Sequence, residues 1–442
     1  MQRGGAPSVI ERIVEVDPAR RAQWLMPSAI RRVHPKVMRY LLPVHLSDAW
    51  VQGDLLLCEV HGPVGRVATI QNTNRRSLID YRDAALFPGT KLVAVLAPRA
   101  GASTCVARVP DRPGPELHLH GVGGQAATIV PGSENSALYR GIPTTVKILA
   151  RLGAPDGRPL NMRRFALQVS PTPRARSSVD PSLILVLGSD MDAGKTATAR
   201  RIIYSLRAMG RPVAAGKATG VGSLFDIASM FDAGASEVFD FTDLGEPVTI
   251  GLSREHVLSL FHRIFNHLRS RVGPDGFVVI ELADGIWYRE TRYLLEDETV
   301  RALVTHAVFA CHSILDAERG VEVLAGLGYE GRLKAISGRL GSSGVLREIA
   351  GKRFGGQPPV FDSLDYACSP ETVAALFGVH GPAAPQPAPM GGAGPPRRWR
   401  RWLASGLGVA LLAACTARDA PPAEDDRLAA DATGASGALV AE

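Results

Sequence analysis

The stretch that decides the fold is residues 183–209, LILVLGSDMDAGKTATARRIIYSLRAM. It begins with the apolar run 183–187, which is typical of a buried strand. A loop with a glycine at each end, Gly188 and Gly194, follows, and residues 195–209 then have a helical pattern. A tight loop between a strand and a helix points backbone N–H groups and the helix N-terminus at an anion. The stretch therefore predicts a phosphate-binding loop.

The last residues of this loop have the side chains that a nucleotide phosphate needs. Gly194 lets the backbone approach closely, Lys195 can reach the β- and γ-phosphates, and the Thr196 hydroxyl can bind Mg²⁺. The sequence therefore predicts ATP and Mg²⁺ as cofactors. The residues expected to contact the nucleotide are Gly188, Ser189, Asp190, Met191, Asp192, Ala193, Gly194, Lys195, Thr196 and Ala197.

The spacing of the loop departs from the strict pattern G-x-x-x-x-G-K-[ST]. That pattern would have glycine at position 189, where this chain has serine, and Gly188 comes one residue earlier. The spacing resembles that of dethiobiotin synthetase and its relatives in the SIMIBI group of P-loop NTPases. Their loop begins Gly-Thr-Asp, and here Gly188, Ser189 and Asp190 stand at those places.

Two charged residues downstream extend the resemblance. Lys217 ends the segment VAAGK, where dethiobiotin synthetases have a lysine beside the transferred phosphate. Glu281 lies in VVIELADG, where they have a glutamate that serves Mg²⁺. The resemblance thus implies catalytic roles for Lys195, Lys217 and Glu281. Burying a charge is costly unless it is paired or bound to a metal, which favours function for Glu281; Lys217 could instead belong to a structural ion pair.

A further carboxylate for Mg²⁺ is implied after Lys217. The candidates are Asp226 and Asp232, ahead of Asp240 and Asp243, although either of the first two could face solvent on a helix. Two loops rich in small residues are candidate ligand contacts. Residues 219–223 could let a substrate approach the γ-phosphate or could simply form a tight turn, and residues 337–344, at the carboxyl edge of the sheet, could contact a base or a substrate. The middle region is also similar to an uncharacterised family of bacterial P-loop proteins, over about residues 40–380.

Proline- and glycine-rich stretches divide the chain. The expected parts are a poorly ordered arm 1–35, a small β-rich domain 36–170, a linker 171–182, a P-loop NTPase domain 183–380, and a linker with an atypical tail 381–442. In the P-loop domain strands alternate with helices, which predicts an α/β fold with a parallel sheet. The expected strands are 183–187, 212–216, 277–282, 307–311, 333–336 and 359–361; the expected helices are 195–209, 224–233, 254–271, 296–305, 317–327 and 345–350.

The β-rich domain is predicted from short valine-rich runs separated by Gly, Pro, Asp and Asn. These runs are 51–60, 64–70, 91–97 and 103–109, and a helix is expected near 144–152. His118 and His120 alternate as on one face of a strand and have no partner at metal spacing, so they are expected at the surface.

Composition bears on the partners and the cellular location of the protein. The 442 residues have a net charge of +7, but their arginines are scattered, which argues against a nucleic-acid partner. Five widely spaced cysteines and the absence of an N-terminal signal segment predict a cytoplasmic protein. Residues 390–415 have the parts of a lipoprotein signal in an impossible position. They are either a joined downstream gene or an amphipathic anchor, and only the second would bring membrane contact.

These features predict an Mg-ATP-dependent ligase or kinase that activates a carboxylate or carbamate of a small, acidic molecule. ATP is preferred to GTP because no Asn-Lys-x-Asp motif is present. The alternatives are an ATPase or GTPase switch that acts on a protein partner, and a nucleotide sensor without catalysis. A homodimer is common in the group that the loop resembles, and one sequence does not decide it.

Overall fold

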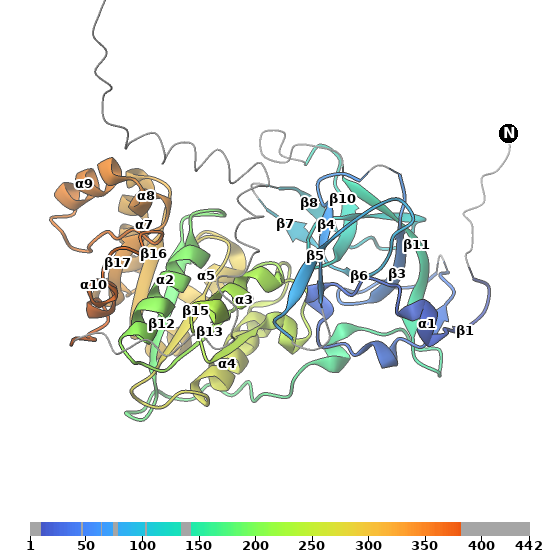
Figure 1. Ribbon diagram of the computed structural model, residues 1–442, viewed down its shortest axis with the longest axis horizontal. Coiled ribbons are helices and arrows are strands. Elements are labelled where there is room, and N and C mark those ends of the chain that lie inside the picture. Colours follow the sequence, from blue (N-terminus) through green and yellow to red (C-terminus); the bar gives the residue numbers. More distant parts are fainter. Residues whose placement is uncertain are drawn as a thin grey trace, which may run out of the picture. The chain divides into compact units, whose positions relative to one another are not determined.

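A computed structural model describes residues 10–381 apart from 46, 63, 74–77, 102–103 and 134–142. The tail 390–442, with its signal-like segment, lies outside the described residues. Within them, no helix is long and apolar enough to cross a membrane. The described residues belong to one compact unit that contains two large sheets. In Figure 1 the strands of the first sheet are blue to teal, and those of the second are green to orange.

The second sheet has six strands, and all of them are parallel. Their order is β14-β13-β15-β12-β16-β17, so β12, which leads into the phosphate loop, lies inside the sheet. The strands are β12 (Ser182–Gly188), β13 (Val213–Lys217), β14 (Glu237–Asp240), β15 (Phe277–Glu281), β16 (His306–Ala310) and β17 (Leu333–Ser337). This arrangement confirms the predicted α/β domain with a parallel sheet.

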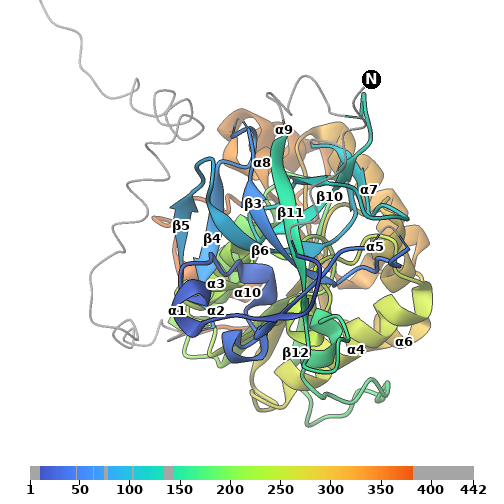
Figure 2. The same ribbon diagram turned by 90° about the vertical axis from the view of Figure 1, so that its right-hand side faces the viewer.

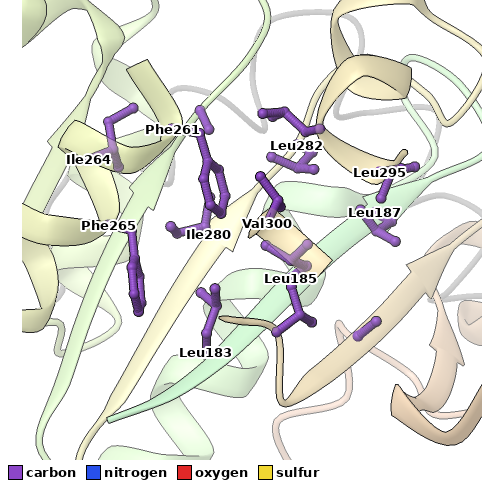
Figure 3. Close-up of a cluster of buried hydrophobic side chains, with 14 of the residues drawn as sticks. Leu183, Leu185, Leu187, Phe261, Ile264, Phe265, Ile280, Leu282, Leu295 and Val300 are labelled. Atoms are coloured by element: carbon purple, nitrogen blue, oxygen red, sulfur yellow. The ribbon is translucent and has the colours of Figure 1, made fainter. Parts of the chain in front are cut away.

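Helices cover both faces of this sheet because the side chains of its strands alternate between two apolar cores. Leu183, Leu185 and Leu187 of β12 point into one core, which Figure 3 shows with Phe261 and Phe265 of α4. The intervening Ile184 and Val186 point into the other core, against α2 and α10. The helices are α2 (Lys195–Ala208), α3 (Leu224–Asp232), α4 (Arg254–Arg269), α5 (Arg289–Leu295), α6 (Glu298–Leu303), α7 (Ile314–Gly326), α8 (Arg339–Ser342), α9 (Gly344–Arg353) and α10 (Pro370–Ala375).

Some elements of this domain differ from the sequence prediction. The short strand β14 was not predicted, nor were helices α5, α8 and α10. Residues 359–361 do not form the predicted strand and meet β17 only through an isolated bridge between Ile336 and Val360. Strand β14 lies at the edge of the sheet and pairs with β13. Its four residues are too short a pattern to predict a strand, and the pairing with β13 stabilises the extended conformation.

The first sheet has nine strands, and within the described residues every pairing is antiparallel except that of β6 with β10. A separate hairpin, β4 with β5, accompanies it. The elements are β1 (Val14–Glu15), α1 (Pro18–Arg21), β2 (Tyr40–Leu42), β3 (Leu55–Val60), β4 (Thr69–Thr73), β5 (Tyr81–Ala85), β6 (Lys91–Leu96), β7 (Arg99–Ala100), β8 (Val106–Arg108), β9 (Glu116–Leu119), β10 (Gln125–Ile129) and β11 (Thr144–Gly153), with 3-10 turns at Ser28–Ile30, Pro35–Val37 and Met162–Phe165.

The helix predicted near 144–152 is wrong, because this segment is β11, the longest strand of the chain as described (Figure 2). Its side chains alternate between buried and half-buried from Thr144 to Leu149. The β-branched residues Thr144, Thr145, Val146 and Ile148 favour a strand, and pairing with β3 and β9 fixes it there.

Two expectations for the first 120 residues need correction. Residues 10–35 are not a poorly ordered arm, because Trp24, Met26 and Ile30 are buried in the core beside β3 and β6. His120 is not at the surface either: it is buried, and its Nε2 donates to the carbonyl of Ala97 at 2.8 Å.

Candidate phosphate and magnesium site

The loop between β12 and α2 has the backbone shape that the sequence predicted. Gly194 has φ +98° at the N-cap of α2, a left-handed conformation in which glycine has no side chain to strain. Asp192 also has a positive φ, +59°. The neighbouring strands hold the loop: the Ser189 N–H donates to the carbonyl of Ala310 at 2.9 Å, and the Ile286 N–H donates to the carbonyl of Gly188 at 2.9 Å.

The segment after β17 packs directly against this loop. A Cβ on Gly194 would lie 2.9 Å from the Cα of Gly338, too close for any side chain. The Arg339 N–H donates to the carbonyl of Ala193 at 3.1 Å, and its Nε donates to the carbonyl of Asp192 at 2.7 Å. The predicted substrate loop 337–344 therefore supports the phosphate loop from outside, through its backbone and one arginine.

The buried Lys195 extends along the inside of the loop. A Cβ on Gly188 would lie 2.7 Å from Cδ of Lys195, so glycine at 188 leaves the space for the lysine chain. The ammonium group donates to the carbonyls of Asp190, at 2.7 Å, and Asp284. Burial lowers the pKa of Lys195, and the nearby carboxylate of Glu281 opposes that shift. The lysine side chain therefore lies inside the loop, held between the backbones of Asp190 and Asp284.

Thr196 and Glu281 lie together at the base of the loop. The Thr196 hydroxyl donates to Oε1 of Glu281 at 3.2 Å. Oε2 of Glu281 is buried and has no hydrogen-bond partner within the described part of the chain. Burial raises the pKa of Glu281, and the Lys217 ammonium works against that shift. A buried oxygen without a partner is costly, and a hydroxyl with a carboxylate is the donor set that Mg²⁺ takes beside phosphates. The pair fits a magnesium ion, although no group of three or more His, Cys, Asp or Glu within the described ranges is arranged to hold a metal.

Lys217 meets the same site from the next strand. It ends β13, and in the pairing with β15 its partner is Glu281. Its Nζ lies 2.5 Å from Oδ2 of Asp226, in the first turn of α3. Burial alone lowers the pKa of Lys217, but the carboxylates of Asp226 and Glu281 outweigh it and raise that pKa above its usual range. Lys217 is therefore a charged ammonium held beside the phosphate loop.

The candidate magnesium aspartates separate in the structure. Asp226 reaches the site through Lys217, whereas Asp232 is the exposed last residue of α3, six residues or about 9 Å further along that helix. Asp232 is therefore not placed to complete the predicted metal site. Asp240 and Asp243 are occupied elsewhere, because both form buried ion pairs with Arg31 at 3.0 and 2.6 Å.

Asp284 belongs to the site but was not predicted. It follows the end of β15, and its backbone carbonyl accepts a hydrogen bond from Lys195. Burial raises the pKa of its carboxyl group, and the charges of Lys217, Lys195 and Arg99 oppose that shift. The only signal in the sequence is the spacing Glu281-x-x-Asp284-Gly285 after a buried strand, which puts a second carboxylate at the same edge.

Tyr288 and His312, which were also not predicted as site residues, contact the phosphate loop at Asp190 and Met191. The Tyr288 hydroxyl donates to Oδ1 of Asp190 at 2.9 Å, and the Met191 N–H donates to the same oxygen at 2.7 Å. Nε2 of His312 lies 3.0 Å from the carbonyl of Met191. These contacts come from the segments after β15 and β16, so all the strands around β12 help to fix the loop.

Comparisons with known proteins add little to this geometry. No family model matches the chain, and no curated protein matches it. Among solved structures, a ParA family ATPase from Chlorobium tepidum TLS is similar, with 15% sequence identity and a TM-score of 0.28, over 46% of this chain and 91% of that one. A likeness of this size carries no argument about function, which has to follow from the residues of the chain itself.

Proposed function

We propose that the chain binds Mg-ATP and transfers its γ-phosphoryl group to a small molecule, as a kinase or as a ligase that activates its acceptor. The observation that supports this most is the convergence of Lys195, Lys217, Thr196 and Glu281 at one edge of the parallel sheet. Phosphoryl transfer needs little more than positioning and charge neutralisation, and these residues supply both.

The proposed roles follow from position. Lys195 and the N–H groups of residues 192–197 bind the β- and γ-phosphates, since this end of the loop leads directly into the N-terminus of α2. Thr196 and Glu281 would hold the magnesium ion, which when bound neutralises phosphate charge. Lys217 neutralises charge on the transferring group once its contact with Asp226 loosens. The cationic setting suits an acidic acceptor, and a carboxylate or carbamate is the class that the sequence resemblance implies.

A phosphate-release assay on the full chain tests the proposal. The purified protein is given Mg-ATP with and without a pool of small metabolites, beside Lys195→Ala. Lys352→Ala is the matched control, because Lys352 is exposed on α9 and pairs with Glu348. We expect a slow release of phosphate to water that the pool raises severalfold, and both rates should fall on the order of a hundredfold or more in Lys195→Ala, the scale of one lost electrostatic contact with the transition state.

Each other result has a definite meaning. The same turnover with and without the pool would favour an ATPase switch over a kinase or ligase. Nucleotide binding without turnover under any condition would favour a sensor. A wild-type chain that does not bind Mg-ATP in a titration would overturn the proposal as a whole.

A further inference from the structure

The carboxyl group of Asp284 has no role in the proposed machinery for binding phosphate and magnesium. It makes no hydrogen bond with any described residue, and the aspartate is half-buried. Glu281, three residues earlier, already occupies the place beside Thr196. A carboxylate kept at a phosphate site without a partner calls for an explanation in the chemistry of the site.

The backbone fixes this residue against the phosphate loop. The hydroxyls of Thr219 and Thr291 both donate to the carbonyl of Ala283, at 2.5 and 2.8 Å. On the other side, a Cβ on Gly285 would lie 2.4 Å from the carbonyl oxygen of Ser189, so residue 285 packs on the loop through bare backbone. Asp284 stands between these two anchored residues, and its own carbonyl meets the ammonium group of Lys195. The backbone of Asp284 is therefore fixed against the phosphate loop, beside the ammonium group of Lys195.

The surrounding charges oppose the effect of burial on the pKa of this carboxyl group. Lys217 of β13, Lys195 of α2 and Arg99 of β7 lie near enough to favour the carboxylate, and Asp190 of the phosphate loop opposes them. Burial works in the other direction and raises the pKa of the carboxyl group. A carboxylate whose pKa is raised is a stronger proton acceptor than an exposed aspartate, which suits a general base.

We propose that Asp284 is the general base that takes the proton of the nucleophile attacking the γ-phosphoryl group, and that the acceptor is a small molecule with a hydroxyl group. This inference rests on the proposed function and narrows it. An ionised carboxylate has no proton to lose and would need no base at this place. The hydroxyl class therefore replaces the carboxylate that the sequence resemblance implies.

The step balances without any further reactant. The O–H bond of the acceptor breaks, its proton moves to Oδ of Asp284, and the oxygen forms a bond to the γ-phosphorus. The bond between that phosphorus and the oxygen bridging to the β-phosphate breaks, and ADP leaves with the electron pair. Asp284 then releases the proton to solvent. Water in place of the hydroxyl acceptor gives inorganic phosphate by the same step.

The test uses Mg-ATP, with water as the acceptor, on the full chain. Asp284→Asn keeps the shape of the side chain but cannot take the proton. Asp275→Asn is the matched control, because Asp275 is exposed just before the amino end of the same strand, β15. We expect phosphate release to fall about a hundredfold or more in Asp284→Asn, the scale of general-base catalysis, while the Kd for Mg-ATP and its Mg²⁺ dependence stay within about twofold of wild type.

The pH profile separates this role from a structural one. In wild type, release should fall as the pH drops through the raised pKa of Asp284, because the base becomes protonated, and this acid limb should vanish in Asp284→Asn. Three results would overturn the inference. These are wild-type rates in Asp284→Asn, an increased Mg²⁺ requirement that places the residue at the metal, and a wild-type chain that binds Mg-ATP without releasing phosphate at any pH. Loss of Mg-ATP binding in wild type would instead overturn the proposed function.

Discussion

Each of the two sheets contains a buried carboxylate, and the two carboxylates are bonded in different ways. In the first sheet, Asp54 has a partner on each oxygen: Oδ2 meets Arg151 at 2.9 Å and Oδ1 accepts from Asn161 at 3.0 Å. In the parallel sheet, Glu281 meets Thr196 with Oε1, and Oε2 has no partner among the residues described. A buried charge whose bonds are complete serves the fold, whereas one with an unused oxygen at the carboxyl edge of strands is suited to a ligand.

The difference extends to the neighbouring cations. Arg151 of β11 is buried beside Asp54 and Asp48, which lie in the segment before β3. Lys195 and Lys217 converge instead on the end of β12 and β13, where a parallel sheet brings the carboxyl ends of its strands together. Burial of a charge alone thus does not indicate a ligand site. The indications are a position where the carboxyl ends of parallel strands meet and an oxygen without a hydrogen-bond partner.

Substitution of Asp54 should have the largest effect, and we expect it to change stability but not nucleotide binding. Asp54→Ala would leave Arg151 buried without its main partner and should lower the free energy of unfolding by about 3–5 kcal/mol. Urea unfolding measures this, and Asp48→Ala is the milder control, because its contact with Arg151 is longer, at 3.4 Å. The Kd for Mg-ATP should be unchanged. A variant that loses nucleotide binding at wild-type stability would contradict the contrast between the sheets.

In contrast to Asp54→Ala, Glu281→Gln should change stability little and turnover strongly. It removes a charge whose burial is only partly compensated, so the free energy of unfolding should fall by no more than about 1 kcal/mol or rise. Turnover with Mg-ATP should nevertheless fall on the order of a hundredfold, through weaker stabilisation of the transition state. Unfolding and phosphate release measured on the same preparation check both parts. Strong destabilisation with intact turnover would place Glu281 among the structural charges.

Acidification gives the smallest effect and again concerns the first sheet. Burial lowers the pKa of His120 to about 3, below its usual value, so the unfolded chain takes up a proton first as the pH falls. Stability from the neutral imidazole is complete above the unfolded pKa and is lost as the pH falls from there towards the folded pKa. Between neutral pH and about pH 4.5 this amounts to about 2 kcal/mol. His120→Gln should lose correspondingly less over that interval, as urea unfolding at both pH values would show. Equal losses in the two proteins would mean that His120 does not titrate in this way.

Much of the parallel sheet was predictable because strong local patterns and tertiary context agree there. The runs 183–187 and 277–282 are too apolar for anything but buried strands, and the helix after Lys195 begins where the glycine ends the loop. The segment Thr144–Gly153 was not predictable in the same way. Its apolar residues fit a helical face as well as a strand, and only pairing with β3 and β9 decides between them.

Site residues that lie at the end of a strand could be predicted from the sequence. Site residues in the loop beyond a strand could not, because the conformation of the loop sets their positions. Lys217 and Glu281 close β13 and β15, so their meeting follows from parallel pairing. Asp284, Tyr288 and His312 lie after the strands, and their positions depend on turns that no periodicity describes. The choice of Asp226 over Asp232 depends on where α3 begins relative to Lys217, a matter of one and a half turns.

The close approach of Gly194 to Gly338 joins two segments that are synthesised at different times. The ribosome makes the whole first sheet, the phosphate loop and all six parallel strands before it reaches residue 338. Until then the loop lacks the neighbour whose backbone lies against Gly194 and Ala193. The loop that follows the first strand of the parallel sheet is thus completed by the residues that follow its last strand, so capture of a nucleotide requires all six strands to have been synthesised.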